Sequence, residues 1–228
     1  MERVTHERRL KAYEVEMPVR AGRDRVWEAV SKPPVLHRWF GWDYVGLDAE
    51  IQQIFVKAVT RVAREKRMGW ADGSYLEIIG DAGQSVVRVV REGPPASGPD
   101  HFDAIEEGWK AFLVQLRFLL EHNPQGVRRT IYLTGECTGG EALGLADTGW
   151  QRVGSRVAWT VDPDGHLVVT AGNRPLDASP PNAMQIIVST YGLSDAEFET
   201  CRDGWAKRWA ATAEGAIVTV AGSPDPAG

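Results

Sequence analysis

"DAIEEGWKAFLVQLRFLLEH", which runs from Asp103 to His122, is the stretch that decides the fold. Asp103, Glu106 and Glu107 lie in the first turns, where the helix dipole favours negative charge, and Asn-Pro-Gln-Gly follows as a stop signal. A long helix with a broad apolar face needs a sheet or other helices to cover it. We therefore expect this helix to close a domain. Its apolar side chains recur at helical spacing: Ile105, Trp109, Phe112, Leu113, Leu116, Leu119 and Leu120.

The residues before this helix predict an antiparallel sheet accompanied by shorter helices. Polar and apolar side chains partly alternate in Ala12–Val19, and the turn residues Gly80–Gln84 separate two further strands, Tyr75–Ile79 and Val86–Arg91. The prolines of Ser31–Pro34 break the helical pattern. Three helices are expected between the first two strands, at 22–30, 35–40 and 48–67. The last of them carries a basic side: Lys57, Arg61 and Arg64.

The second half repeats this order in a reduced form. A strand is expected at Arg128–Glu136, and a short helix weakened by glycine at Gly139–Gly149. The turn "DPDG" at Asp162–Gly165 lies between two strands. A further strand, Ala183–Gly192, precedes a second closing helix, Ser194–Ile217, whose Ser194 and Glu197 have the spacing of a capping box.

Two sequence echoes favour an internal duplication. "GWADGSYLEIIGDAGQSVV" at Gly69–Val87 is similar to "GWQRVGSRVAWTVDPDGHLVV" at Gly149–Val169, and "FDAIEEGW" in one half corresponds to "FETCRDGW" in the other. We therefore predict two halves, 1–124 and 125–228. A glycine weakens a helix by about 1 kcal/mol, so we expect the glycine before each helical tryptophan where a neighbouring backbone comes close or the indole needs room. The equivalent pairs would be Gly108-Trp109 and Gly204-Trp205.

The composition excludes several classes of function. The formal charge is −5 and neither half is strongly basic, which argues against nucleic-acid binding. The N-terminus lacks the apolar core of a signal peptide, and no stretch approaches the roughly 20 apolar residues of a membrane span. Cys137 and Cys201 form no CxxC pair. We expect a cytoplasmic protein with free thiols.

No catalytic, metal or cofactor motif stands out. Thr134–Gly144 superficially resembles a phosphate loop but lacks its lysine and hydroxyl, and neither GxSxG nor HExxH occurs. The adjacent Glu106 and Glu107 do not face each other on a helix. The five histidines are scattered, with no pair at ligand spacing on one helix: His6, His37, His101, His122 and His166. The sequence predicts no metal and no cofactor, and it favours binding over catalysis.

Three blocks resemble a known superfamily. They are "VRAGRDRVWEAVSKPPVLHRWF" (19–40), "MGWADGSYLEII" (68–79) and "AIEEGWKAFLVQLRFLLE" (104–121). Together they look like the SRPBCC (START-like, helix-grip) superfamily, in the branch of the activator of Hsp90 ATPase homologues. The resemblance implies an α+β fold, an antiparallel sheet packed on a long C-terminal helix, followed here by a diverged second START-like half. Because a helix at 48–67 leaves the first half short of strands, the second half is a candidate to complete its sheet.

The resemblance also implies a ligand. Members bind hydrophobic small molecules in a cavity between the sheet and the closing helix. The alternatives are an Hsp90-activator-like module whose partner is a chaperone, and a polyketide cyclase/dehydratase-like enzyme. For the aromatic residues, the alternative to a role in the pocket is packing in the core. For His37, the alternative is exposure to solvent. The oligomeric state stays open, with a dimer as one alternative. The candidate ligand-binding residues are His37, Trp39, Phe40, Trp70, Trp109, Phe112, Leu113 and Leu116.

Overall fold

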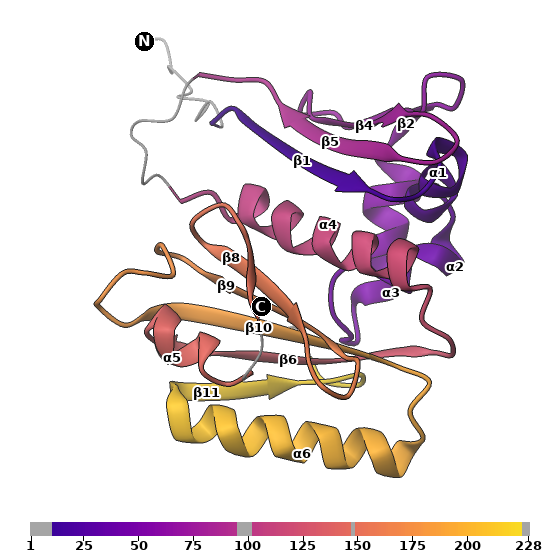
Figure 1. Cartoon of the computed structure of the whole chain (residues 1–228). Coiled ribbons are helices and arrows are strands. Elements are labelled where there is room, and N and C mark those ends of the chain that lie inside the picture. Colours follow the sequence, from indigo (N-terminus) through magenta and orange to yellow (C-terminus); the bar gives the residue numbers. More distant parts are fainter. Residues whose placement is uncertain (1–10, 95–101, 147–148, 225–228) are drawn as a thin grey trace, which may run out of the picture.

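The computed structural model describes residues 11–94, 102–146 and 149–224. Its elements form four layers, with a sheet, a helical layer, a second sheet and an outer helix stacked in that order (Figure 1). The chain therefore has an α+β, helix-grip architecture in two halves, as the sequence predicts. His6 and His101 lie outside the described residues.

The first sheet is formed entirely by the first half and is antiparallel in the order β1-β5-β4-β3-β2. Two short helices follow β1, and the second of them begins with the two prolines that break the first. The strands are β1 (Tyr13–Val19), β2 (Thr60–Val62), β3 (Arg67–Gly69), β4 (Tyr75–Gly80) and β5 (Ser85–Arg91), and the helices are α1 (Arg23–Ser31) and α2 (Pro33–Leu36).

The prediction of one helix over 48–67 is wrong for the second half of that range. The structure has α3 (Leu47–Gln52), one π-helical turn (η1, Gln53–Lys57), and then the β2–β3 hairpin. The β-branched residues Val59, Thr60 and Val62 are poor in a helix and favourable in a strand. The basic face expected on this helix therefore does not form, because Arg61 lies in β2 and its guanidinium donates to the carbonyl oxygens of Ser31 and Phe55.

The second sheet is formed entirely by the second half, in the order β11-β6-β10-β9-β8-β7. The idea that its strands complete the first sheet is thus wrong. Apart from β11, its order matches that of the first sheet strand for strand, with β6 in the place of β1 and β10 in the place of β5. Its elements are β6 (Arg128–Cys137), α5 (Gly139–Leu143), β7 (Gln151–Val153), β8 (Val157–Val161), β9 (Leu167–Gly172) and β10 (Asn182–Tyr191).

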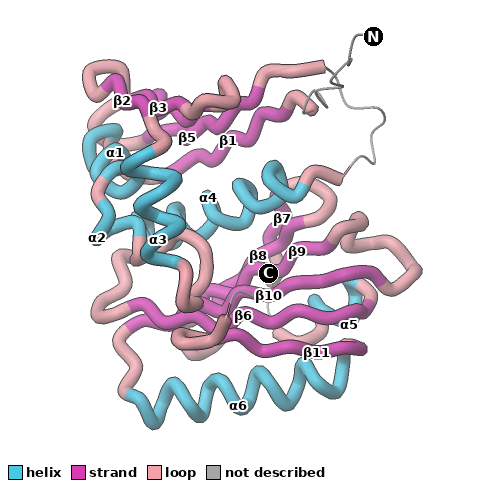
Figure 2. Tube along the Cα trace, turned by 180° about the vertical axis from the view of Figure 1, so that it is seen from behind, coloured by secondary structure: helices cyan, strands magenta, loops and turns pink. Residues whose placement is uncertain are grey.

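Helix α4 (Ala104–His122) lies between the two sheets and contacts β1 on one side and β8 and β9 on the other (Figures 1 and 2). The hydrophobic core around α4 therefore includes residues of both halves, such as Leu113 and Val169. Burial on two sides explains why even Gln115 and Glu107 are inside, whereas Ile105, expected on the apolar face, is 51% exposed at the helix start.

Helix α6 (Asp195–Thr212) covers the far face of the second sheet, against β6 and β11. The predicted capping box is present, with the Ser194 hydroxyl and the Glu197 carboxylate each bonded to the other's backbone N–H. The helix ends at Thr212, earlier than expected, because the remaining residues form the edge strand β11 (Glu214–Thr219). Among the described residues, no helix is both long and apolar enough to cross a bilayer.

Candidate functional site

Most of the predicted ligand-binding residues meet in one aromatic cluster beneath the first sheet. We define this aromatic cluster as Trp39, Phe40, Phe55, Trp70, Trp109 and Phe112. The ring of Phe55 lies at its centre, 4.8 Å from Phe40 and 6.4 Å from both Trp70 and Trp109, measured between ring centroids. The sequence did not single out Phe55, because it lies in the segment expected to be a regular amphipathic helix.

The aromatic cluster is closely packed. Trp39 has no exposed surface and its indole N–H donates to the carbonyl oxygen of Ala29, while the Trp70 indole donates to that of Ile54. Leu113 and Leu116, on the same helix as Trp109, are also fully buried. These side chains occupy the space between helix and sheet in which the ligand was expected, and their ligand-binding role stays a prediction.

His37 does not belong to the cluster. It caps the C-terminal end of α2, and its Nε2 lies 3.3 Å from a carboxylate oxygen of Asp48, a residue that is itself largely exposed. This position fits the alternative in which His37 faces solvent.

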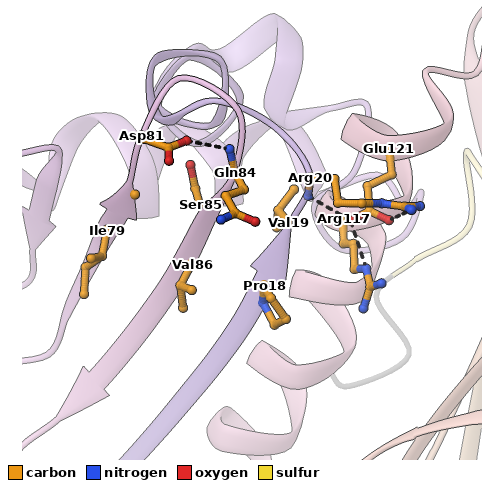
Figure 3. A pocket seen from close by; sticks show the side chains of 11 residues that line it. Pro18, Val19, Arg20, Ile79, Asp81, Gln84, Ser85, Val86, Arg117 and Glu121 are labelled. Carbon is orange, nitrogen blue, oxygen red and sulfur yellow. Dashed lines mark hydrogen bonds and ion pairs between the residues drawn. The ribbon is translucent and has the colours of Figure 1, made fainter.

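A first cavity, of about 400 Å³, lies where the turn between β4 and β5 meets the C-terminal end of α4 (Figure 3). Its carboxylates already have partners within the protein, and Asp81 accepts from the backbone N–H groups of Gly83 and Gln84. Glu121 accepts from the backbone N–H of Arg20 and pairs with the guanidinium of Arg117 at 3.2 Å. Burial alone would raise the pKa of Glu121, but these partners outweigh it and lower that pKa. The carboxylate of Glu121 is therefore already satisfied by groups of the protein.

A second and larger cavity, of about 830 Å³, runs along α6 in the second half. We call it the α6 groove. Helix α6 forms one wall with residues spaced three or four apart, and the turn between β8 and β9 forms the other, with Leu193 and Ala146 between them. The α6 residues that line it are Ala196, Glu197, Thr200, Cys201, Gly204, Trp205 and Arg208.

The side chain of Trp205 on α6 gives the α6 groove an apolar border. Trp205 is only 2% exposed and packs into the second core, so its indole is held firmly in place. The guanidinium of Arg208 lies 4.2 Å from the centre of that ring and donates to the carbonyl oxygen of Leu145. These two contacts hold the Arg208 side chain at the edge of the groove. At Gly204 an added Cβ would meet no atom within 4 Å. The missing side chain of Gly204 thus leaves room in the groove.

The polar end of the α6 groove is built on the "DPDG" turn. Asp162 accepts from the backbone N–H groups of Asp164 and His166 with one carboxylate oxygen, and Gly165 takes the positive φ of +86° that the turn requires. The other oxygen of Asp162 lies 3.2 Å from Nδ1 of His166, and Sγ of Cys201 lies 3.9 Å from the same nitrogen. The hydrogen bond to the Asp162 carboxylate, helped by the contact with Cys201, raises the pKa of His166 to about 10.

Sequence reasoning missed this site. It identified the turn and the Gly-Trp echo separately, and it treated the histidines as scattered. The only signal was the capping box at Ser194, which places Cys201 two turns into α6, on the side of Ala196 and Gly204. Nothing local in the sequence indicates that this face meets the turn at Asp162.

Comparison with known proteins finds distant structural likeness only. No family model and no curated protein matches the chain. DynU16, from the dynemicin biosynthetic locus, is 18% identical over 88% of this chain and 95% of its own, with a TM-score of 0.36.

The di-domain ARO/CYC proteins BexL, from the BE-7585A biosynthetic pathway, and StfQ, from the steffimycin biosynthetic pathway, are 12% and 10% identical. They match 87% and 88% of this chain and 94% of each of their own, with TM-scores of 0.35 and 0.32. None of the three is described as an Hsp90 activator, so that branch of the resemblance receives no support from them.

Proposed function

We propose that this protein binds a small molecule with an apolar body in the α6 groove. The observation that carries the proposal is the volume of about 830 Å³ between a closing helix and the β8–β9 turn of its sheet. Ligand sites in proteins occupy roughly 300–1,000 Å³ and combine apolar walls with a few fixed polar groups. The α6 groove has both features, and it lies in the second half rather than under α4.

Gly204 supports this proposal. A glycine inside a helix costs about 1 kcal/mol relative to alanine, and here no neighbouring atom occupies the space that a side chain would fill. Packing therefore does not require a glycine at this position. The space left open above Gly204 gives the residue a role, because a side chain there would project into the groove.

The chemistry of the walls defines the class of ligand. Leu193, Ala196 and the edge of Trp205 suit an apolar body, whereas Thr200, the protonated His166 and the other groups at the turn suit a hydrogen-bonding substituent. We infer an amphiphilic ligand whose polar group points towards the β8–β9 turn. The alternative of a chaperone partner rests on the family resemblance alone and gains no support from the fold, because the basic side expected at 48–67 does not form on a single helix. The cyclase or dehydratase alternative stays a prediction.

Thermal unfolding against a library of fatty acids and aromatic polyketides tests the proposal. A ligand that binds only the folded state raises stability by about 2.7 kcal/mol at a concentration 100 times its Kd. The melting temperature of the unchanged chain should rise with at least one compound of the library. Gly204→Leu, which fills the groove, should abolish that rise.

Two variants serve as controls. Ala210→Leu adds the same bulk to an exposed position of α6 that does not line the groove, and His37→Ala removes the candidate near α2. Both should keep the ligand-induced rise. A rise that survives Gly204→Leu, or a library without any stabilising compound, would exclude the α6 groove as the binding site.

A further inference from the structure

The hydrogen-bonding capacity left over in the first cavity belongs to its two arginines, Arg20 and Arg117. Each places one guanidinium nitrogen 3.2 Å from the carboxylate of Glu121, Nη2 in Arg20 and Nε in Arg117. A guanidinium carries five N–H donors, and neither of these two donates to any other acceptor in the described part of the chain. Two cations therefore share one carboxylate, and most of their donors are left for a ligand or for water.

The charges of the first cavity are unevenly distributed. Arg117 is fixed on α4, where its guanidinium also lies 5.6 Å from the centre of the Trp159 ring, and Arg20 follows β1 with its side chain 80% exposed. The remaining charged residue of the lining, Asp81, lies at the other end of the cavity, where two backbone N–H groups of the β4–β5 turn donate to it (Figure 3). The end of the cavity at α4 thus has one positive charge in excess.

A row of apolar side chains leads from these cations across the first sheet. Pro18 of β1 pairs with Val86 of β5, and Val86 pairs with Ile79 of β4, so the three side chains share one face of the sheet. All three line the cavity, and Ile79 is 49% exposed (Figure 3). We call them the apolar row. It ends at β1, the edge strand that contacts α4.

We propose that the first cavity binds a small carboxylic acid. The carboxylate lies between Arg20 and Arg117, and the apolar chain follows the apolar row. The planar fork of an arginine matches a carboxylate in shape as well as in charge. A volume of about 400 Å³ is near the lower end for ligand sites, which suits a short acid.

This site is independent of the proposed function, because the α6 groove lies in the other half of the chain. Ion pairs of exposed side chains are weak, so a short acid at micromolar concentration adds little to the stability of the fold. The melting test of the α6 groove, performed at such concentrations, therefore does not report on this cavity.

Nuclear magnetic resonance of the isotope-labelled full-length protein tests the site, with octanoate as the probe. Octanoate should shift the methyl signals of Ile79 and Val86 and the guanidinium signals of Arg20 and Arg117, and these shifts should saturate. Octan-1-ol has the same chain without the charge, and acetate has the charge without the chain. We expect each to bind about tenfold more weakly than octanoate, because each lacks one part of the interaction. Added salt should weaken octanoate more than octan-1-ol.

Three variants complete the experiment. Arg20→Gln removes an exposed cation and should weaken octanoate binding about 3- to 10-fold while leaving octan-1-ol unchanged. Arg25→Gln is the matched control, because Arg25 is an exposed arginine of α1 outside the cavity. Gly204→Leu fills the α6 groove and should leave the shifts at Ile79 intact. Equal affinities for octanoate and octan-1-ol, equal octanoate affinities of Arg20→Gln and the unchanged chain, or loss of the shifts in Gly204→Leu would each overturn the proposal.

Discussion

The guanidinium of Arg128 donates a 2.7 Å hydrogen bond to the carbonyl oxygen of Gly41, across 87 positions of sequence. Arg128 begins β6 in the second half, whereas Gly41 lies in the loop after α2 in the first half. The same side chain also donates to the carbonyl oxygen of Phe40 and to the side chain of Gln115 on α4. A buried cation thus joins the two halves at the point where the chain passes from one to the other.

Removing this cation should destabilise the whole molecule. Arg128→Ala leaves buried acceptors without a donor, at roughly 1–3 kcal/mol for each, so we expect a loss of about 3 kcal/mol or more. Arg129→Ala is the control, because Arg129 pairs with an exposed Asp195 and lies over Phe198; its loss should be about 1 kcal/mol. Urea unfolding measures both. Two separate transitions in the unchanged chain would show that the halves unfold independently.

Replacing either helical glycine, Gly108 or Gly204, by alanine should stabilise the fold. The same change at a tightly packed glycine would destabilise it. The expectation that a neighbouring backbone approaches Gly108 or Gly204 is wrong: at Gly108 an added Cβ would meet only a ring atom of Phe112 at 3.8 Å, and at Gly204 nothing within 4 Å. Gly108→Ala and Gly204→Ala should each stabilise the fold by up to about 1 kcal/mol in urea unfolding. A loss of stability in either variant would mean that its glycine is needed for packing.

An ion-pair network at the start of α4 should make stability depend on acid pH. Glu106 is bonded to Lys11 at 2.7 Å and to Lys110 at 2.9 Å. Burial would raise the pKa of Glu106, but the two lysines outweigh it and bring that pKa below its ordinary value of 4.5. Since the pKa is lowered in the folded state, the stabilisation is present above about pH 4.5 and is lost as the pH falls through the folded-state value.

Glu106→Gln should therefore lower the free energy of unfolding at neutral pH and make its fall between neutral and acid pH shallower. The measurement is urea unfolding at a series of pH values. Glu136→Gln, at an exposed position of β6, should follow the curve of the unchanged chain. If the free energy of unfolding falls equally steeply with pH in Glu106→Gln and in the unchanged chain, the ion pairs of Glu106 do not cause the pH dependence.

Local sequence patterns predicted most of the elements. Helix α4, the hairpin β4–β5, the "DPDG" turn and the capping box of α6 each depend on contacts between residues close in the chain, so their signals are visible in short windows. The failures came where local propensity was ambiguous. The segment at 57–67 has a helical pattern of apolar residues, yet it pairs as β2 with β3, because pairing satisfies its backbone and suits its β-branched residues.

By itself, the sequence determined the α+β class, two halves with long closing helices and the absence of a recognisable catalytic motif. Only the tertiary structure decided that α4 lies between two sheets and that His166 meets Cys201, 35 residues away, at the end of the α6 groove. The physical reason is that periodicity shows which face of an element is apolar but not which partner covers it. The candidate site lies where two such elements meet, so no short stretch of sequence contains it.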